Sequence, residues 1–273
     1  MVKLCLCVAI IFLTAKARSQ TDPSGCALEV LEKENPQYIF LGENHFDNNP
    51  LLFFYNILPK LKSMGFRTIF VEYFESYDQN HIDRLSAQNL VDRFSDPQLQ
   101  ILDLLINDWG YDSSKYYAIS FLALQSGLKL RGIDRRRDLV YMTDFREKMA
   151  VRDQHMFLIS SQYITMFPEE KIIFFNGYSH SRRALPGYGP TLFDHFMEHY
   201  GNKKIMSLKH DYLYDLSQQR MDLRIIHGEN LKMNCSEDFY FYKDPQSEQF
   251  NYHIFLDPQE LLPLSDQYNT TSI

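Results

Sequence analysis

The stretch QYIFLGENH, residues 37–45, decides the fold and raises the question of function. Its apolar run stops at Gly42 and is followed directly by Glu43 and His45. A short apolar run bounded by a turn residue is typical of a strand that is buried on both faces of a sheet. A carboxylate and an imidazole two positions apart, directly after such a strand, indicate a site at the rim of the sheet.

The rest of the chain repeats this pattern, with short apolar runs alternating with longer amphipathic segments. Further strands are expected at 66–74, 128–134, 171–177 and 203–210, and helices at 50–65, 78–90, 96–108, 113–126, 137–164 and 189–201. Beyond Tyr212 the pattern turns to strands and loops, at 222–228, 238–244 and 252–257. Alternating strands and helices are the signature of βαβ units. We therefore expect an α/β fold: a mostly parallel central sheet flanked by helices, with a helical insertion at about residues 78–126 and a β-rich C-terminal part.

Length and composition favour one globular domain. The chain has 273 residues, of which 45% are hydrophobic, and a formal net charge of −7. That is enough apolar material for one large core, and no linker rich in proline, glycine or serine divides it. An acidic chain without a lysine- and arginine-rich segment is a poor partner for nucleic acid, since phosphate neutralisation needs clustered cations. We expect a single domain over residues 18–264 and a flexible tail at 265–273.

The N-terminal residues have the layout of a secretory signal peptide. Lys3 precedes an apolar run at 4–15, and Ala15 and Ala17 supply small residues at a cleavage-like spacing. The apolar run is short for a membrane span, and a signal anchor that stays attached is the alternative. We expect residues 1–17 to be removed, which leaves a secreted or periplasmic protein with no integral membrane span.

Export changes how the cysteines are counted. Cys5 and Cys7 lie within the expected signal peptide, so Cys26 and Cys235 remain. In an oxidising compartment such a pair is expected to form a disulfide between the mature N-terminus and the C-terminal region. Two free cysteines are the alternative.

Polar side chains lie at or near the end of four of the expected strands. They are Glu43 and His45 after the first, Glu72 in the second, Asp134 at the end of the third, and Asn176 and His180 at the fourth. Ligands bind outside the carboxyl ends of the strands in open α/β sheets, and these ends meet at one edge. We therefore expect these side chains to share one pocket.

Each of these residues also has a structural interpretation. Glu72 is costly to bury unless it is paired, and a structural arginine, Arg152 or Arg135, is the alternative to a functional role. Asp134 also suits a turn, and His45 an ordinary loop. On the long helix, an arginine that points at the strand ends would supply a contact for an anion. The alternative is a set of arginine–aspartate ion pairs on a solvent-exposed surface, which would contribute little to stability. One face of that helix carries, at helical spacing, Arg146, Met149, Ala150 and Asp153.

Several familiar catalytic motifs do not occur in the sequence. There is no G-x-S-x-G elbow, no H-E-x-x-H, no P-loop and no C-x-x-C pair. A serine or cysteine nucleophile therefore has no support. Carboxylates and two histidines remain, and they suit either water activated by general-base catalysis or a divalent metal held by His45, Glu43 and His180.

Five segments occur in an order that is informative as a set. They are LGENHFDN at 41–48, GFRTIFVEYFESYDQNHID at 65–83, GID at 132–134, MAVRDQHM at 149–156 and FFNGYSHSRRALPGYGPTLFDHF at 174–196. Together they resemble a superfamily that includes the erythromycin esterases, the ChaN-type haem-binding proteins and the Tiki-type proteases. The resemblance covers roughly residues 38–200.

This resemblance implies an α/β fold with its site at the strand ends. It makes four residues the first candidates for catalysis: Glu43, His45, Glu72 and His180. Residues expected behind them, or in contact with substrate, are Asp134, Arg152, Asn176 and Tyr178. The chain beyond Tyr212 has no counterpart in the superfamily, and DNNP at 47–50 lacks the arginine found there in the esterases, which counts against macrolide esterase activity.

The function expected from the residues is a secreted hydrolase acting on a small-molecule or peptide substrate. His45 would take a proton from water, and Glu43 or Glu72 would orient its imidazole. His180 or Arg152 would stabilise the developing oxyanion. A divalent metal and haem are both open as cofactors.

Two other functions stay open at the level of sequence. The first is an uptake protein that binds haem or a metal without catalysis, for which the cue is the aromatic content and the position of Tyr73 and Tyr178 beside the expected site. The second is a toxin or effector module that keeps the fold and has lost the chemistry.

Overall fold

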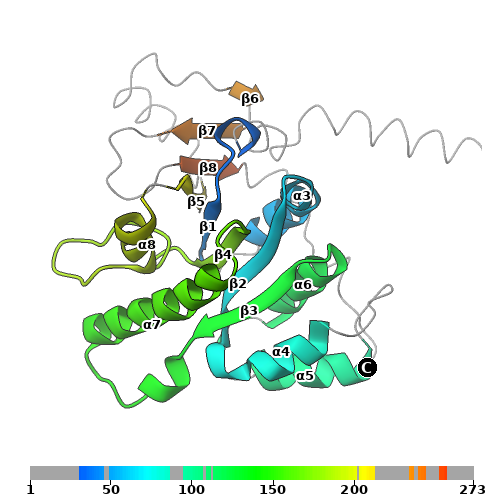
Figure 1. Cartoon of the computed structure of the whole chain (residues 1–273), viewed down its shortest axis with the longest axis vertical. Coiled ribbons are helices and arrows are strands. Elements are labelled where there is room, and N and C mark those ends of the chain that lie inside the picture. Colours follow the sequence, from blue (N-terminus) through cyan, green and yellow to red (C-terminus); the bar gives the residue numbers. More distant parts are fainter. Residues whose placement is uncertain are drawn as a thin grey trace, which may run out of the picture.

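One sheet of eight strands runs through the part of the chain that the structure describes (Figure 1). The computed structural model describes residues 31–45, 49–86, 95–106, 109–111, 113–201, 203–212, 234–236, 239–243 and 252–256. The strands are β1 (Tyr38–Glu43), β2 (Phe66–Glu75), β3 (Lys129–Asp134), β4 (Lys171–Gly177), β5 (Ile205–Tyr212), β6 (Asn234–Ser236), β7 (Phe239–Lys243) and β8 (Tyr252–Leu256). The helices are α3 (Asn49–Ser63), α4 (Gln79–Ser86), α5 (Asp96–Ile106), α6 (Ser113–Gln125), α7 (Phe145–Met166) and α8 (Leu192–Tyr200), with short 3-10 turns η1 (Ser76–Asp78) and η2 (Arg136–Leu139).

The strand order in this sheet is β3-β2-β4-β1-β5-β8-β7-β6. The first six strands in that order, β3 to β8, run parallel to one another, whereas β7 pairs antiparallel with both β8 and β6 at the far edge. The expected α/β fold with a mostly parallel sheet is therefore confirmed. The helical insertion is present as α4, α5 and α6 between β2 and β3, and the β-rich C-terminal part as β6, β7 and β8.

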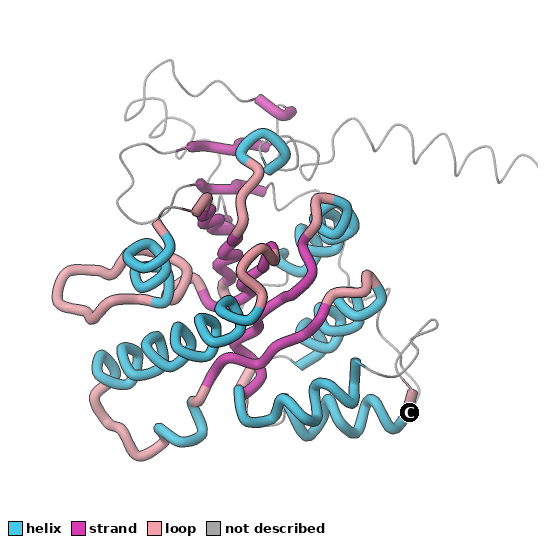
Figure 2. Tube along the Cα trace, in the orientation of Figure 1, coloured by secondary structure: helices cyan, strands magenta, loops and turns pink. Residues whose placement is uncertain are grey.

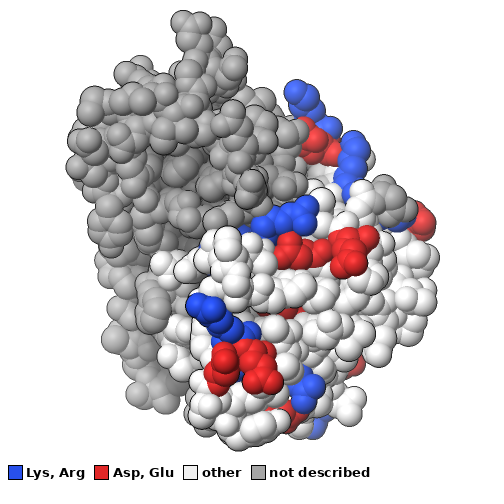
Figure 3. All heavy atoms as spheres, turned by 90° about the vertical axis from the view of Figure 1, so that its left-hand side faces the viewer, with Lys and Arg blue, Asp and Glu red and all other residues white. Residues whose placement is uncertain are grey.

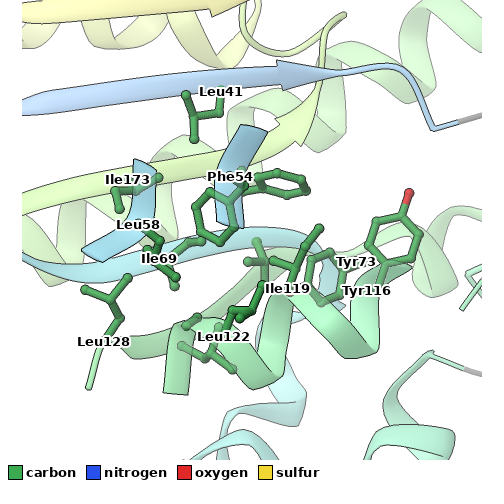
Figure 4. Packing of buried hydrophobic residues seen from close by; sticks show 14 of the residues in the cluster. Leu41, Phe54, Leu58, Ile69, Tyr73, Tyr116, Ile119, Leu122, Leu128 and Ile173 are labelled. Carbon is green, nitrogen blue, oxygen red and sulfur yellow. The ribbon is translucent and has the colours of Figure 1, made fainter. Parts of the chain in front are cut away.

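Helices lie on both faces of the central sheet (Figure 2). Side chains along the central strands alternate between two cores, one on each face. Leu41 of β1 packs toward α3 and α6, whereas its neighbour Phe40 packs toward α7 and α8. Figure 4 shows the first core, where Ile69 of β2 and Ile173 of β4 point toward the same helices as Leu41. Burial on both faces explains why these strands are continuous apolar runs in the sequence.

The direction of the crossovers reverses between the neighbouring strands β1 and β4. The chain leaves β1 through α3 to reach β2 on one side, and it leaves β4 through α8 to reach β5 on the other side. The helices α3 and α6 cover one face and α7 and α8 the other (Figure 1). In open α/β sheets such a reversal leaves a crevice outside the carboxyl ends of the strands, where ligands bind.

The long helix differs from its expected range, 137–164. The structure places η2 first, and α7 begins only at Phe145. The reason is the N-cap residue Asp144, whose carboxylate accepts hydrogen bonds from the backbone amides of Arg146 and Glu147. A capping carboxylate satisfies amides that have no partner within the helix.

Several expectations fall outside the described residues. They concern the signal peptide at 1–17, the strand at 222–228 and the tail at 265–273. Cys26 is not described, and only the backbone of Cys235 is described, within β6, so their pairing stays a prediction. Among the helices that are described, none combines the length and the apolar character that a membrane crossing requires.

Candidate active site

The end of β1 places an acid and an imidazole in direct contact. Glu43 is the last residue of β1, and its Oε1 lies 3.0 Å from Nδ1 of His45. The carboxylate is buried, whereas 17% of the His45 side chain is exposed. A carboxylate on Nδ1 fixes the orientation of the ring and favours the tautomer that leaves Nε2 as the acceptor.

Helix α6 holds this acid in place from the face opposite to α7. Lys115 is only 1% exposed, and its Nζ lies 2.7 Å from Glu43 Oε2 and 3.0 Å from the carbonyl oxygen of His45. The Tyr116 hydroxyl lies 3.1 Å from Glu43 Oε1 and 3.2 Å from His45 Nδ1. Burial, followed by the charge of Glu43, raises the pKa of Tyr116, so its phenol stays neutral and donates to the carboxylate. The pair of Glu43 and His45 is therefore supported by a buried cation and a neutral donor.

Glu72 of β2 lies between the two histidines of the site. Its Oε2 accepts a hydrogen bond of 2.5 Å from the Gly177 amide and lies 3.9 Å from Nε2 of His45. Its Oε1 lies 3.2 Å from Nε2 of His180. Burial alone would raise the pKa of Glu72, but the cations around it, led by His180 and Arg152, hold that pKa well below the usual range. Glu72 is therefore an anion buried at the centre of the site.

Arg152 of α7 joins the ends of β2 and β3. Its Nε and Nη2 lie 2.9 Å and 2.8 Å from the two carboxylate oxygens of Asp134, and Nη2 also lies 2.6 Å from Glu72 Oε1. Burial lowers the pKa of Arg152, but Asp134 and Glu72 outweigh it and raise the pKa above the ordinary value. The structural partner that the sequence allowed for Glu72 is therefore present, and it is Arg152.

His180 is held by two carboxylates on its two ring nitrogens. Nδ1 lies 2.7 Å from Asp153 Oδ1, and Nε2 faces Glu72. Burial would lower the pKa of His180, but Asp153 and Glu72 outweigh it and raise the pKa to about 10. At neutral pH this histidine is an imidazolium that donates from both nitrogens, which leaves it no lone pair with which to take a proton.

Gly177 at the end of β4 makes room for the His45 ring. A Cβ at this position would lie 2.7 Å from His45 Nε2 and 3.2 Å from Glu72 Oε2. The other sides of the ring are covered by Trp109, whose ring centroid lies 5.1 Å away edge-on, and by Tyr111, at 4.5 Å. His45 is thus confined by packing as well as by hydrogen bonds.

The structure brings Glu43, His45, Glu72, Arg152 and His180 together, but two other expected residues take different positions. Asn176 is buried, and its Oδ1 accepts from the Ser181 hydroxyl at 2.8 Å. Tyr178 is 41% exposed, and the Arg182 guanidinium lies 5.3 Å from its ring centroid. Asn176 therefore contacts the loop that follows β4, and the Tyr178 ring lies against Arg182.

The three expected metal ligands do not face one point. Glu43 lies on the Nδ1 side of the His45 ring, whereas Glu72 and His180 lie toward its Nε2 side. Glu43 is already paired with Lys115, and the two ring nitrogens of His180 face Asp153 and Glu72. Among the described residues, no group of three histidine, cysteine, aspartate or glutamate side chains could hold a metal ion. His45, Glu43 and His180 therefore do not form a metal site in this arrangement.

Two groups of residues were missed or only partly seen in the sequence. The first group supports the cluster from the helices and consists of Lys115, Tyr116 and Asp153. The feature of the sequence that could have indicated it is a lysine within the otherwise apolar helix expected at 113–126. The second is Arg136, the middle residue of the basic run 135–137 that follows the third strand. Its guanidinium lies 4.4 Å from the Trp109 ring, and none of its buried nitrogens has a hydrogen-bond partner among the described residues. Its ion pairs are long, at 3.6 Å to Asp134 and 3.7 Å to Glu75, so its donors are available.

The fold is shared with several solved structures of low sequence identity. A succinoglycan biosynthesis protein matches with a TM-score of 0.58 and 10% identity, over 84% of this chain and 90% of that chain. ChaN of Campylobacter jejuni, described with cofacial haem binding, matches with a TM-score of 0.50 and 13% identity, over 84% and 91%. An erythromycin esterase variant in its open conformation matches with a TM-score of 0.50 and 14% identity, over 88% and 81%.

These matches define the class of protein at the level of fold. The chain is an α/β protein with the fold seen in ChaN and in an erythromycin esterase, as the ordered motifs led us to expect. No family model matches the sequence, and no curated protein matches it by sequence.

Proposed function

We propose that this protein is a hydrolase in which His45 activates water as a general base. The observation that carries the proposal is the placement of the His45 ring. Nδ1 is held by Glu43 at 3.0 Å, Nε2 faces Glu72 across 3.9 Å, and 17% of the His45 side chain is exposed. This is the geometry that a general base requires, with one nitrogen oriented and the other available.

The proposed reaction is attack of water on a carbonyl or a related electrophile. Nε2 of His45 takes a proton from water while the oxygen forms a bond to the electrophilic atom. Glu43 and Glu72 stabilise the imidazolium that forms, and the same proton then passes from His45 to the leaving group as its bond breaks. No proton is gained or lost over the cycle.

The other charged groups of the cluster have different proposed roles. The ring nitrogen Nε2 of His180 and the guanidinium of Arg152 already contact carboxylates. We therefore assign these two residues to holding Glu72 and Asp134 in place. Arg136 has unused donors, and its partner ring Trp109 packs against His45. We therefore assign stabilisation of the developing negative oxygen to Arg136.

The test of this function is hydrolysis of a panel of acyl and aryl esters and short peptides by the purified mature protein. His45→Asn should lower turnover about 10²-fold to 10⁴-fold, the usual contribution of a general base. His81→Asn is the matched control, because His81 lies in α4 outside the cluster. A folded His45→Asn variant with undiminished turnover would count decisively against His45 as the base.

Haem binding is the alternative function that the sequence leaves open. The Tyr73 hydroxyl is not available as an axial ligand, since Tyr73 is buried and its hydroxyl lies 3.1 Å from that of Ser120. Tyr178 remains as an exposed phenol. A saturable Soret band on titration with haem, lost in Tyr178→Phe, would establish this alternative in place of hydrolysis.

The proposed location is outside the cytoplasm. It rests on the signal-peptide layout of residues 1–17, together with the expected single domain over 18–264. The N-terminal sequence of protein recovered from its host should begin at Arg18. A recovered N-terminus at Met1 would contradict both the cleavage and the proposed start of the domain.

A further inference from the structure

A cavity of about 270 Å³ lies beside the cluster, between α7 and the loop that joins β4 to α8. Its wall includes Asp153 and Tyr178 and also contains Arg146, Arg182 and Tyr188. The face of α7 that carries Arg146, Met149, Ala150 and Asp153 at helical spacing is part of this wall. The volume lies just below the usual ~300–1,000 Å³ of small-molecule sites, so there is room for one substituted ring system and not for a macrocycle.

The cavity shares two elements of its wall with the cluster. The backbone amide of Tyr178 donates to the carbonyl oxygen of Glu43 at 2.8 Å. On the opposite wall, Asp153 holds Nδ1 of His180 at 2.7 Å. A molecule bound here would therefore lie next to the residues that we assign to catalysis.

The charge on the cavity wall is positive. Asp153 is the only acid in the lining, and it is offset by the His180 imidazolium and by a 2.8 Å hydrogen bond from the Leu192 amide at the start of α8. Arg146 has no carboxylate within ion-pair distance among the described residues, and its guanidinium donates a long, 3.5 Å hydrogen bond to the Gly187 carbonyl oxygen. On the coloured part of the face in Figure 3, acidic and basic side chains lie next to one another in several places and form no large patch of either sign.

The same arginines lie against aromatic rings. The Arg146 guanidinium lies 4.9 Å from the centroid of Tyr188, and the Arg182 guanidinium lies 5.3 Å from that of Tyr178. Apolar atoms of Met149, Ala150 and Leu185 complete the wall. Tyrosine faces and apolar side chains favour a flat hydrophobic body, and a guanidinium favours a carboxylate or phosphate on that body.

We propose that this cavity binds a small anionic molecule with a flat apolar body, such as an aryl carboxylate or aryl phosphate. As a statement about a binding site, this inference stands on the cavity alone. As an assignment of substrate class, it rests on the proposed hydrolase function. The cavity then holds the anionic aromatic part of a substrate while its scissile bond lies toward His45.

Binding of a matched pair of probes tests the proposal without requiring turnover. 2-Naphthoate and 2-naphthamide have nearly the same shape and differ in charge, and their affinities are measured by isothermal titration calorimetry on the mature protein. Naphthoate should bind at least ~10-fold more tightly, since hydrogen bonds to charged groups are worth about twice the neutral ones. Arg146→Gln and Arg182→Gln should each reduce that preference at least ~5-fold.

Arg84→Gln is the charge-matched control, since Arg84 lies on the exposed side of α4 outside the cavity lining. Equal affinity for the two probes, no binding of either, or an equal loss in Arg84→Gln would overturn the proposal. His45→Asn should leave naphthoate affinity unchanged. Loss of turnover with binding intact supports both inferences, whereas binding by a protein that hydrolyses nothing refutes the hydrolase and leaves the binding site in place.

Discussion

The two carboxylates around His180 give the stability of this protein a defined pH dependence. The pKa of His180 is raised from 6.5 to about 10 in the folded protein by Asp153 and Glu72, which outweigh burial. A group whose folded pKa is raised stabilises the fold fully below its unfolded pKa, and this contribution disappears as the pH rises through its folded pKa. At about 1.4 kcal/mol per pKa unit, the full contribution is about 5 kcal/mol, present below pH 6.5 and lost by about pH 10.

The perturbation that tests this reasoning is Asp153→Asn. The asparagine side chain keeps an oxygen that can accept the hydrogen bond from the Leu192 backbone amide, so the start of α8 is preserved. The substitution removes the negative charge that faces His180 Nδ1. Breaking a buried ion pair by removing one partner costs about 3–5 kcal/mol. The variant should therefore be less stable than the wild type by that amount at pH 6, and the difference should shrink toward pH 10.

Urea unfolding at intervals from pH 6 to pH 10 measures both quantities. The wild-type free energy of unfolding should fall by up to about 1.4 kcal/mol per pH unit over this range, and the variant should show a shallower slope. Asp83→Asn is the control, because Asp83 is exposed: it makes a 3.7 Å ion pair with Arg131 and accepts a 2.8 Å hydrogen bond from the Gln79 side-chain amide, which asparagine can also accept. Parallel pH profiles for the wild type and Asp153→Asn would refute the assignment of His180 as a cation held by Asp153.

Three further substitutions probe the site. Gly177→Ala places a methyl group 2.7 Å from His45 Nε2. Turnover should fall about 10²-fold, and the free energy of unfolding in urea should fall by about 1–3 kcal/mol. Unchanged turnover would show that the His45 ring is not confined. Lys115→Met leaves Glu43 as a buried anion without its ammonium partner and should cost about 3–5 kcal/mol in the same unfolding experiment, and a neutral result would mean that this ion pair does not support the site. Tyr116→Phe removes one hydroxyl from Glu43 and should lower stability by about 1 kcal/mol; a larger kinetic than thermodynamic effect on turnover would indicate that the phenol also orients His45.

The sequence by itself was sufficient for the fold class and for the edge of the sheet at which the candidate residues lie. Apolar runs such as 38–41 and 172–175 are continuous because helices cover both faces of the sheet, and this burial leaves a clear pattern. Parallel strands end at the same edge, so Glu43, Glu72 and His180 were expected near one another before any strand order was known. These inferences depend only on local periodicity and on a general property of parallel sheets.

Only the tertiary structure decided which groups face each other. The order β2-β4-β1 puts Gly177 against His45 and the Glu72 carboxylate between the two imidazoles. The partners Lys115 and Asp153 come from helices that pack on opposite faces, and no local spacing in the sequence specifies that choice. Their positions follow from strand order and helix packing, which are set by burial across the whole domain. The carboxylates that this packing places on the two ring nitrogens of His180 outweigh the effect of its burial and make it a cation rather than a base.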